Sequence, residues 1–250
     1  MTPPPVDALV ELFVGPTAHG LPAQLVHQDG VRVRPPARRG HIDVLVTREP
    51  PGHIALVDGR YDDVPAVGHR ELLDALAAGW TVTGLGSIGA LRAAELLPHG
   101  MTGYGQVFAH LLATEAPDDE VALLHGPAPD YQPISEALVD WRAFAEHLVG
   151  AGLVDHDQAA AAIGLLAGRW FGDRSQPAFI DAIRTTAGDT AADAARAHLP
   201  RLPDLRVKTR DLRDYLTERP WTQPPTLSRS CPPIAEAGPS STTSTPRRSC

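Results

Sequence analysis

One stretch of the chain, residues 80–97, restricts the possible folds more than any other. Residues 82–85 are mostly apolar and β-branched, as in a buried strand, and 90–97 consist of strong helix formers. Between them, Gly84-Leu85-Gly86-Ser87-Ile88-Gly89 predicts a tight turn from strand to helix. Ser87 would lie at this turn, beside the first N–H groups of the helix, which lack partners within it. Either Ser87 caps the helix, or those N–H groups bind a phosphate or stabilise an oxyanion.

The first half of the chain alternates between strand-like and helix-like segments. The predicted strands are 9–14, 31–34, 53–58 and 82–85, and 42–46 is either a strand or a short helix. Residues 69–79 are predicted to form an amphipathic helix, with Gly79 as its C-cap. This alternation predicts an α/β fold with a partly parallel sheet flanked by helices in the N-terminal half. Ligand sites in such sheets lie at the carboxyl ends of strands, where Gly15-Pro16-Thr17, Asp58-Gly59 and Gly86-Ser87 fall.

The second half of the chain is predicted to be mostly helical, wrapping the sheet or forming a subdomain of its own. The acidic residues 118–120 are interpreted as the start of a helix over 121–125, because acidic side chains complement the helix dipole there. Residues 100–105 form a glycine-rich connection. Further helices are expected at 106–113, 135–149, 157–172, 176–187, 191–197 and 208–216.

The ends of the chain differ in composition from the rest. We expect a flexible lead over 1–8, one domain over 9–217 and a disordered tail over 218–250, where Pro, Ser and Thr dominate from Pro220 onward. Within the domain, the α/β core covers about 9–125 and the helical part about 126–217.

Composition excludes several classes of protein. The net charge of −8 argues against a nucleic-acid binder with a broad basic face. No run of some 18 uncharged apolar residues exists, so we expect no membrane span, and residues 1–5 do not resemble a secretory signal. The two cysteines, Cys231 and Cys250, suggest no disulfide framework. These features favour a cytoplasmic protein.

Cofactor motifs are weak or missing. The glycines at 84, 86 and 89 satisfy the dinucleotide-binding pattern, but no acidic residue follows about 20 residues later, where Gly103-Tyr104-Gly105-Gln106 stands. The 11 histidines show no metal-binding spacing, and His69 and His125 are interpreted as structural. We therefore expect neither a metal nor an organic cofactor.

Nucleophilic catalysis has two candidate arrangements. One is a triad of Ser87, a histidine and Asp58, although the pattern Gly-x-Ser-x-Gly is not met. The other pairs Ser87 with Lys208, the sole lysine of the chain. A lysine base requires a lowered pKa, which burial or cationic neighbours such as Arg206 and Arg210 supply. The alternative is that Lys208 is an ordinary surface lysine.

A series of motifs over about 10–216 resembles the TfuA-like family. In order they are Gly15-Pro16-Thr17, Arg34-Pro35-Pro36-x-x-x-Gly40, Asp58-Gly59-x-Tyr61, His69-x-Glu71-Leu72-Leu73, Gly86-Ser87-Ile88-Gly89-Ala90-Leu91-Arg92-Ala93-Ala94-Glu95-Leu96, Gly100-Met101-x-Gly103-x-Gly105, Asp118-Asp119-Glu120-Val121-Ala122, Tyr131-x-Pro133-x-Ser135-Glu136 and Val207-Lys208-x-x-Asp211. The order and spacing of these motifs make the resemblance far more specific than any one of them.

The resemblance implies an accessory role in thioamidation of a peptide backbone beside a YcaO-type cyclodehydratase. Proteins of this family are thought to release sulfide from a thiocarboxylated ubiquitin-like sulfur carrier and to dock on YcaO, helping it to engage its peptide substrate. The family is associated with a serine and a lysine. The serine corresponds to Ser87, and of the two family lysine positions one is Arg70 here, which cannot act as a base, so Lys208 remains.

The resemblance also suggests how the pocket is built. The N–H groups of Ile88 and Gly89, after Gly86, would hold the oxyanion. Four side chains are expected to shape the pocket, namely Arg92, Glu95, Asp58 and His69. For Arg92 and Glu95, the alternative is an ordinary pair within one helix.

Two departures from the family pattern separate the functional hypotheses. Arg70 replaces a lysine, and His41 stands where the family tends to have aspartate. If either position is needed for chemistry, the protein keeps docking and loses hydrolysis. The first hypothesis is therefore a hydrolase in sulfur delivery, and the second is a non-catalytic adaptor that docks on YcaO. A third is a nucleotide-binding module at the glycine-rich turn.

Overall fold

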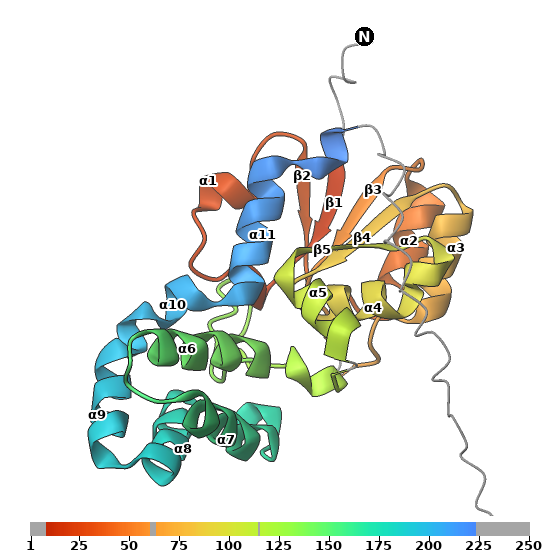
Figure 1. Ribbon diagram of the computed structural model, residues 1–250. Helices are drawn as coiled ribbons and strands as arrows, with labels where there is room; N and C mark the ends of the chain where they lie inside the picture. The colour runs from red at the N-terminus through yellow and green to blue at the C-terminus, as the bar shows by residue number, and fades with distance from the viewer. Residues whose placement is uncertain (1–8, 61–63, 115, 224–250) are drawn as a thin grey trace, which may run out of the picture.

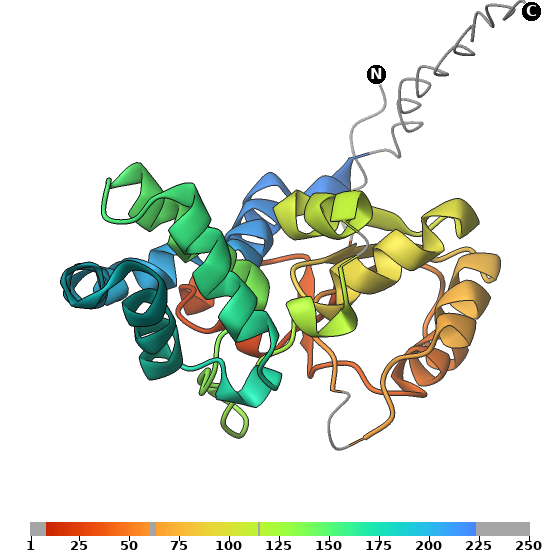
Figure 2. The same cartoon turned by 60° about the horizontal axis from the view of Figure 1, so that its bottom comes forward.

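The computed structural model describes residues 9–60, 64–114 and 116–223 (Figures 1 and 2). The predicted lead over 1–8 and the tail from 224 lie outside the described residues. The strands are β1 (Val10–Phe13), β2 (Val31–Arg34), β3 (His53–Leu56), β4 (Thr81–Leu85) and β5 (Thr102–Tyr104). The helices are α1 (Ala23–Val26), α2 (His41–Arg48), α3 (His69–Ala77), α4 (Ile88–Leu96), α5 (Gly105–Thr114), α6 (Leu138–Gly150), α7 (His156–Ala167), α8 (Gln176–Ala187), α9 (Asp189–His198), α10 (Leu202–Leu205) and α11 (Val207–Glu218).

The strands form one parallel five-stranded sheet in the order β2-β1-β3-β4-β5. This confirms the predicted α/β class and is the strand order of flavodoxin-like doubly wound sheets. The chain moves from β1 to β2 on one side and returns to β3 on the other, so its direction across the sheet reverses between β1 and β3. Residues 42–46, for which strand and helix were both open, belong to helix α2.

Side chains alternate between the two faces of the sheet, as the period of two requires. Ile54 and Leu56 of β3 pack with α2, α3 and α4 on one face. Ala55 and Val57 pack on the other face against Leu212, Tyr215 and Leu216 of α11. Helix α11 therefore covers the sheet face that the four-residue α1 is too short to cover (Figure 1).

The sequence left open whether the second half of the chain wraps the sheet or forms a subdomain, and the structure shows both arrangements. While α11 returns to the sheet, α6 to α10 form a separate helical cluster with its own core, visible at the lower left of Figure 1. The rings of Trp141 and Phe179 stack in this core with centroids 4.4 Å apart. No helix in the described part of the chain is long and apolar enough to cross a membrane.

Four sequence expectations are wrong in their details. The glycine-rich connection contains strand β5, which pairs in parallel with β4 through residues 102–104. The acidic triplet forms only the 3-10 turn Asp118–Glu120, and no helix covers 121–125 within the described residues, because its side chains form ion pairs elsewhere. Helix α7 ends at Ala167, where Arg174 binds its last carbonyls. The ordered chain also extends past the predicted boundary at 218, since Trp221 packs against Tyr215.

Three glycines bring α4 close to the sheet. A Cβ at Gly89 would lie 1.7 Å from the carbonyl oxygen of Leu56, and one at Gly84 would lie 1.9 Å from the carbonyl oxygen of Gly89. Gly86 has a φ of +67°, which L side chains rarely adopt. The glycine pattern that resembles a dinucleotide fingerprint is therefore explained by packing of helix against strand.

We predict that Gly89→Ala lowers the free energy of unfolding by about 3 kcal/mol or more, because the added methyl group meets backbone atoms that cannot move away. The matched control is Gly164→Ala in α7, where nothing lies within 4 Å of the added Cβ. Alanine there should raise stability by about 1 kcal/mol through helix propensity. Chemical denaturation of both variants measures the difference, and equal stabilities would contradict the packing described above.

Candidate functional site

A cavity of about 720 Å³ opens at the carboxyl ends of β1 and β3. This is where the chain reverses direction across the sheet, and doubly wound sheets bind ligands at this position. Strand ends and their loops form one wall, and residues 121–131 form much of the facing wall. The lining residues are Pro16, Pro35, Pro36, Arg38, His41, Asp58, Gly59, Arg60, Ser87, Val121, Leu123, Leu124, His125, Gly126, Pro127, Ala128, Tyr131, Phe171 and Lys208.

Ser87 lies between β4 and α4 and contributes to this cavity. It occupies the N-cap position of α4, but its side chain accepts no hydrogen bond from the helix. Instead, its Oγ donates to the carbonyl oxygen of Val121 at 3.4 Å. The interpretation of Ser87 as a side-chain cap is therefore wrong, and its hydroxyl is turned toward the facing wall of the cavity.

Lys208 reaches the cavity from the first turn of α11. Its side chain is only 2% exposed, so the alternative of an ordinary surface lysine is wrong. The Nζ atom donates to the carbonyl oxygen of Val121 at 2.7 Å, the same oxygen that Ser87 contacts. Because Nζ and Oγ both lie within hydrogen-bonding distance of one atom, the structure brings the serine and the lysine together.

The burial of Lys208 makes its ammonium group easier to deprotonate. Burial lowers the pKa of the Lys208 ammonium, while the carboxylates of Asp58 and Asp140 oppose this shift. Burial also raises the pKa of Asp140 to about 6, against the effect of Lys208. Asp140 accepts a hydrogen bond from the backbone N–H of Lys208 at 3.3 Å, and so contacts the first turn of α11.

Asp58 organises the loop that follows β1. One carboxylate oxygen accepts hydrogen bonds from the N–H groups of Gly15 and Thr17 at 2.8 and 3.0 Å, and the other accepts from the Thr17 hydroxyl at 2.6 Å. Thr17 in turn accepts a hydrogen bond at its carbonyl from Thr209 of α11. Asp58 therefore holds the β1 loop against the helix that carries Lys208, whereas the sequence suggested a triad acid or a residue that shapes the pocket.

The expected oxyanion donors are only partly available. The N–H of Gly89 donates to the carbonyl of Val57 at 3.1 Å, so it is engaged in holding α4 to the end of β3. This contradicts the expectation that Gly89 binds an oxyanion. Ile88 is the first residue of α4, and its N–H is not used by the helix itself. Ile88, next to Ser87, remains the candidate donor.

Three other expected pocket residues form a cluster of their own. Arg92 donates to Glu95 at 2.6 Å, and the His69 ring lies 2.7 Å from the same carboxylate oxygen. Arg92 also donates to the carbonyl of Val67. None of these three side chains lines the cavity around Ser87, so the cluster ties α3 to α4 and the prediction that it shapes the pocket is not met.

The two departures from the family pattern lie in different places. The Arg70 side chain is 88% exposed on α3 and pairs with Asp74, away from the cavity. His41 lines the cavity, and its Nε2 accepts a hydrogen bond from Arg38 Nε at 2.8 Å. Burial, and then the nearby Arg38, lower the pKa of His41. The Arg38 guanidinium therefore disfavours protonation of the His41 ring that it contacts.

Several groups in or near the site were not found from the sequence. The Val121 carbonyl gives no side-chain signal, and Asp140 is one of many acidic residues on helices. In the Lys208-x-x-Asp211 motif, the two side chains have different roles. Lys208 reaches the cavity, whereas Asp211 accepts hydrogen bonds from the N–H groups of Gln106 and Val107 and so caps α5. Only the spacing of that motif could have indicated Asp211.

No metal site accompanies the cavity. Among residues 9–60, 64–114 and 116–223, no three His, Cys, Asp or Glu side chains are grouped as a metal ion would need. His125, interpreted as structural, lines the cavity with its Nδ1 2.7 Å from the carbonyl of Gly126 and its ring edge-on to Tyr131.

Comparison with known families identifies the central part of the chain. Residues 58–175 match the family model described as TfuA-like protein. The matched range contains Asp58, Ser87 and the acidic triplet, and it ends before Lys208. No curated protein matches the chain.

We predict that Asp58→Asn lowers the free energy of unfolding by about 1–3 kcal/mol, because one carbonyl oxygen cannot replace two acceptor oxygens that take three hydrogen bonds. The matched control is Asp181→Asn, whose carboxylate is 61% exposed in an ion pair on α8 and should cost less than about 1 kcal/mol. Thermal or chemical denaturation distinguishes them. Equal losses would mean that Asp58 does not hold the β1 loop.

Proposed function

Because the chain belongs, through residues 58–175, to the TfuA-like family, which indicates an accessory role in thioamidation, we propose that it releases sulfide from a thiocarboxylated sulfur carrier. The carrier is a small ubiquitin-like protein, and the sulfide supplies a YcaO-type cyclodehydratase that modifies a peptide. The observation that supports this proposal most is the meeting of Ser87 Oγ and Lys208 Nζ at the Val121 carbonyl, inside a cavity at the ligand-binding edge of the sheet.

In the proposed reaction, unprotonated Lys208 Nζ takes the proton of Ser87 Oγ while that oxygen attacks the thiocarboxylate carbon. The N–H of Ile88 donates to the oxyanion that forms. The C–S bond breaks, hydrosulfide leaves with the proton from Nζ, and the carrier remains as an ester on Ser87. Water then attacks the ester and gives a proton to Nζ, the C–O bond to Ser87 breaks as Nζ returns that proton to Oγ, and the carrier's new carboxylic acid loses its proton to solvent. The products are carrier carboxylate, hydrosulfide and one proton.

The charge of the cavity suits an anionic substrate. A thiocarboxylate is negatively charged at neutral pH, and its carbon resists attack unless a cation offsets that charge. The guanidinium groups of Arg38 and Arg60 line the cavity, whereas its carboxylate lining residue, Asp58, is already bound by three donors. The hydrogen-bond partner of Arg38 is the imidazole of His41, which carries no negative charge, so the charge of Arg38 is not cancelled by it.

Two specific observations favour the adaptor hypothesis. Gly89 N–H is engaged, and Lys208 Nζ donates to a carbonyl rather than contacting Ser87 directly. An adaptor would bind the same partners without turnover. The nucleotide-binding hypothesis has no such support, because packing accounts for the glycines.

We predict that Ser87→Ala and Lys208→Met each reduce sulfide release from a thiocarboxylated carrier by about a hundredfold or more, because a nucleophile or its base is removed. Methionine has nearly the length of lysine and limits loss of packing. Arg70→Ala is the matched control, since this exposed side chain lies away from the cavity, and it should retain wild-type release. Equal release from all four proteins would refute the hydrolase and leave the adaptor.

We predict that Arg38→Ala raises the KM for the thiocarboxylated carrier by about tenfold, as loss of one charge-assisted hydrogen bond implies, and leaves kcat nearly unchanged. Arg39→Ala is the control, because this neighbouring exposed arginine does not line the cavity. Steady-state kinetics of the two variants at constant ionic strength test the point. An equal rise in KM for both would assign the effect to the general charge of the surface instead.

A further inference from the structure

We propose that the acidic turn, Asp118–Glu120, is a positioning element that sets the geometry of Ser87 and Lys208, and that Arg142 of α6 is the positioning residue that holds it. This inference rests on the proposed function, since it concerns the same serine and lysine. The turn acts through the residue that follows it, Val121, whose carbonyl oxygen both side chains contact. None of the three acidic residues of the turn lines the cavity.

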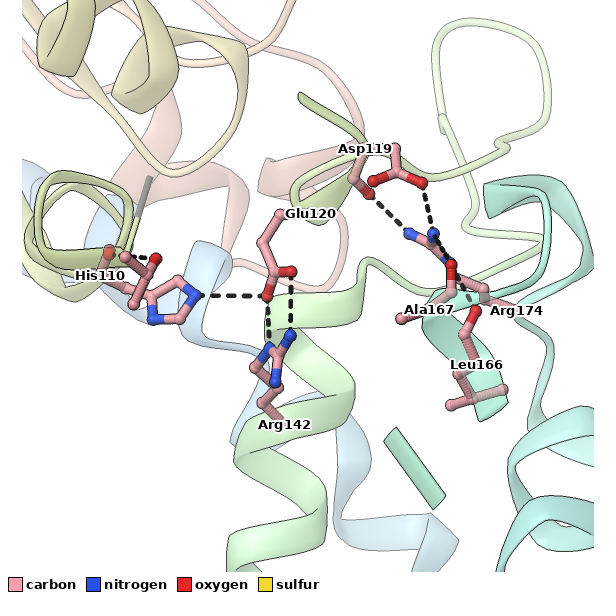
Figure 3. A network of polar contacts seen from close by, with 8 residues as sticks. His110, Asp119, Glu120, Arg142, Leu166, Ala167 and Arg174 are labelled. Atoms are coloured by element: carbon pink, nitrogen blue, oxygen red, sulfur yellow. Dashed lines mark hydrogen bonds and ion pairs between the residues drawn. The ribbon is translucent and has the colours of Figure 1, made fainter. Parts of the chain in front are cut away.

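The first anchor of the turn is Glu120, whose side chain is fully buried (Figure 3). Arg142 donates hydrogen bonds to both carboxylate oxygens, from Nε to Oε1 at 2.6 Å and from Nη2 to Oε2 at 3.3 Å. His110 of α5 lies 3.3 Å from Oε1 on the other side. A buried carboxylate whose two oxygens are both bound by one guanidinium cannot move without leaving a charge unpaired, which costs several kcal/mol. Glu120 therefore fixes the backbone next to Val121.

The second anchor is Asp119, which binds Arg174 (Figure 3). Arg174 is fully buried and donates to both the carbonyl and the carboxylate of Asp119. The same guanidinium donates to the carbonyls of Leu166, Ala167 and Arg169 at the end of α7. Consecutive residues of the turn are thus joined to α6 and α7, both members of the helical cluster.

These anchors explain why an irregular segment can hold a catalytic geometry. In the described residues 121–137 there is no helix or named strand, so no regular hydrogen-bonding pattern fixes the Val121 carbonyl. Buried Lys208 Nζ needs that oxygen as an acceptor, because a buried donor without a partner is costly. Releasing the turn would let the carbonyl shift and would separate Nζ from Ser87 Oγ. A displacement of about 1 Å is enough to slow catalysis by about a hundredfold.

Arg142 is the position at which to test this, because its side chain is 43% exposed and its loss leaves no cavity in the core. The variants are Arg142→Met, which removes the charge, Arg142→Lys, which restores one donor, and Glu120→Gln, which keeps the volume of the carboxylate. Arg196→Met is the matched control, since it removes an exposed arginine that pairs with Asp193 on α9. Each full-length protein is assayed for kcat and KM of sulfide release and for the rate at which a fluorophosphonate labels Ser87.

We expect Arg142→Met to reduce kcat and the labelling rate by about ten- to a hundredfold while KM changes less than about twofold. Arg142→Lys should recover part of the rate, because lysine supplies the charge but cannot form the bidentate hydrogen bonds of arginine. Glu120→Gln should fall between wild type and Arg142→Met, and Arg196→Met should match wild type. The labelling probe is small and needs no carrier, so its rate reports the serine and lysine rather than docking.

Wild-type kcat and labelling in Arg142→Met would overturn the inference and leave the proposed function intact. So would a lower melting temperature with unchanged kcat, because that is the signature of a merely structural ion pair. If Arg142→Met does not fold, the same criteria apply to Glu120→Gln. A wild-type protein that neither releases sulfide nor labels at Ser87 in a manner dependent on Lys208 would overturn the proposed function, and this inference with it.

Discussion

The burial of the Lys208 side chain is the constraint on which the rest of the site depends. A charged ammonium taken out of water must find an acceptor and counter-charges, or it must give up its proton. The structure supplies these from three separate segments: the Val121 carbonyl, Asp58 at the end of β3, and Asp140 on α6. Helix α11 can therefore pack against the sheet in this manner only when the facing loop and α6 are also in place. The lowered pKa of Lys208 follows from the same burial.

The topology of the sheet determines where Lys208 meets the groups that surround it. Because the chain reverses direction between β1 and β3, the loops that follow these strands diverge and leave an opening between them. Asp58 closes part of that opening by binding the β1 loop, and Ser87 reaches it from the next strand along. The segment 121–131 then covers the opening from the other side, and Arg142 and Arg174 bind the two residues just before it. The cavity is thus a product of both halves of the chain.

Sequence reasoning found what depends on local pattern and missed what depends on tertiary contacts. The four predicted strands, the helix at 176–187 and the serine turn all form, because apolar periodicity and glycine placement specify them directly. Strand β5 was missed because it is only three residues long and lies among glycines, which are typical of a turn; it forms by pairing with β4. The helix expected at 121–125 does not form because Asp119 and Glu120 pair with arginines far away in the sequence. Likewise, nothing local to Gly89 reveals that its N–H binds Val57.

The arrangement of α11 explains why the lysine and the aspartate of Lys208-x-x-Asp211 occur together. A spacing of three residues places both on nearly the same face of a helix, here the face turned toward the sheet and α5. Asp211 fixes α11 by binding the first N–H groups of α5, and it does so one turn beyond the lysine. Thr209, between them, donates to the β1 loop. The three contacts leave α11 little freedom to rotate or slide, and so the position of the Lys208 amine is set by backbone contacts on both sides of it. A hydrolase and an adaptor would both need this fixed helix, but only a hydrolase needs the amine itself.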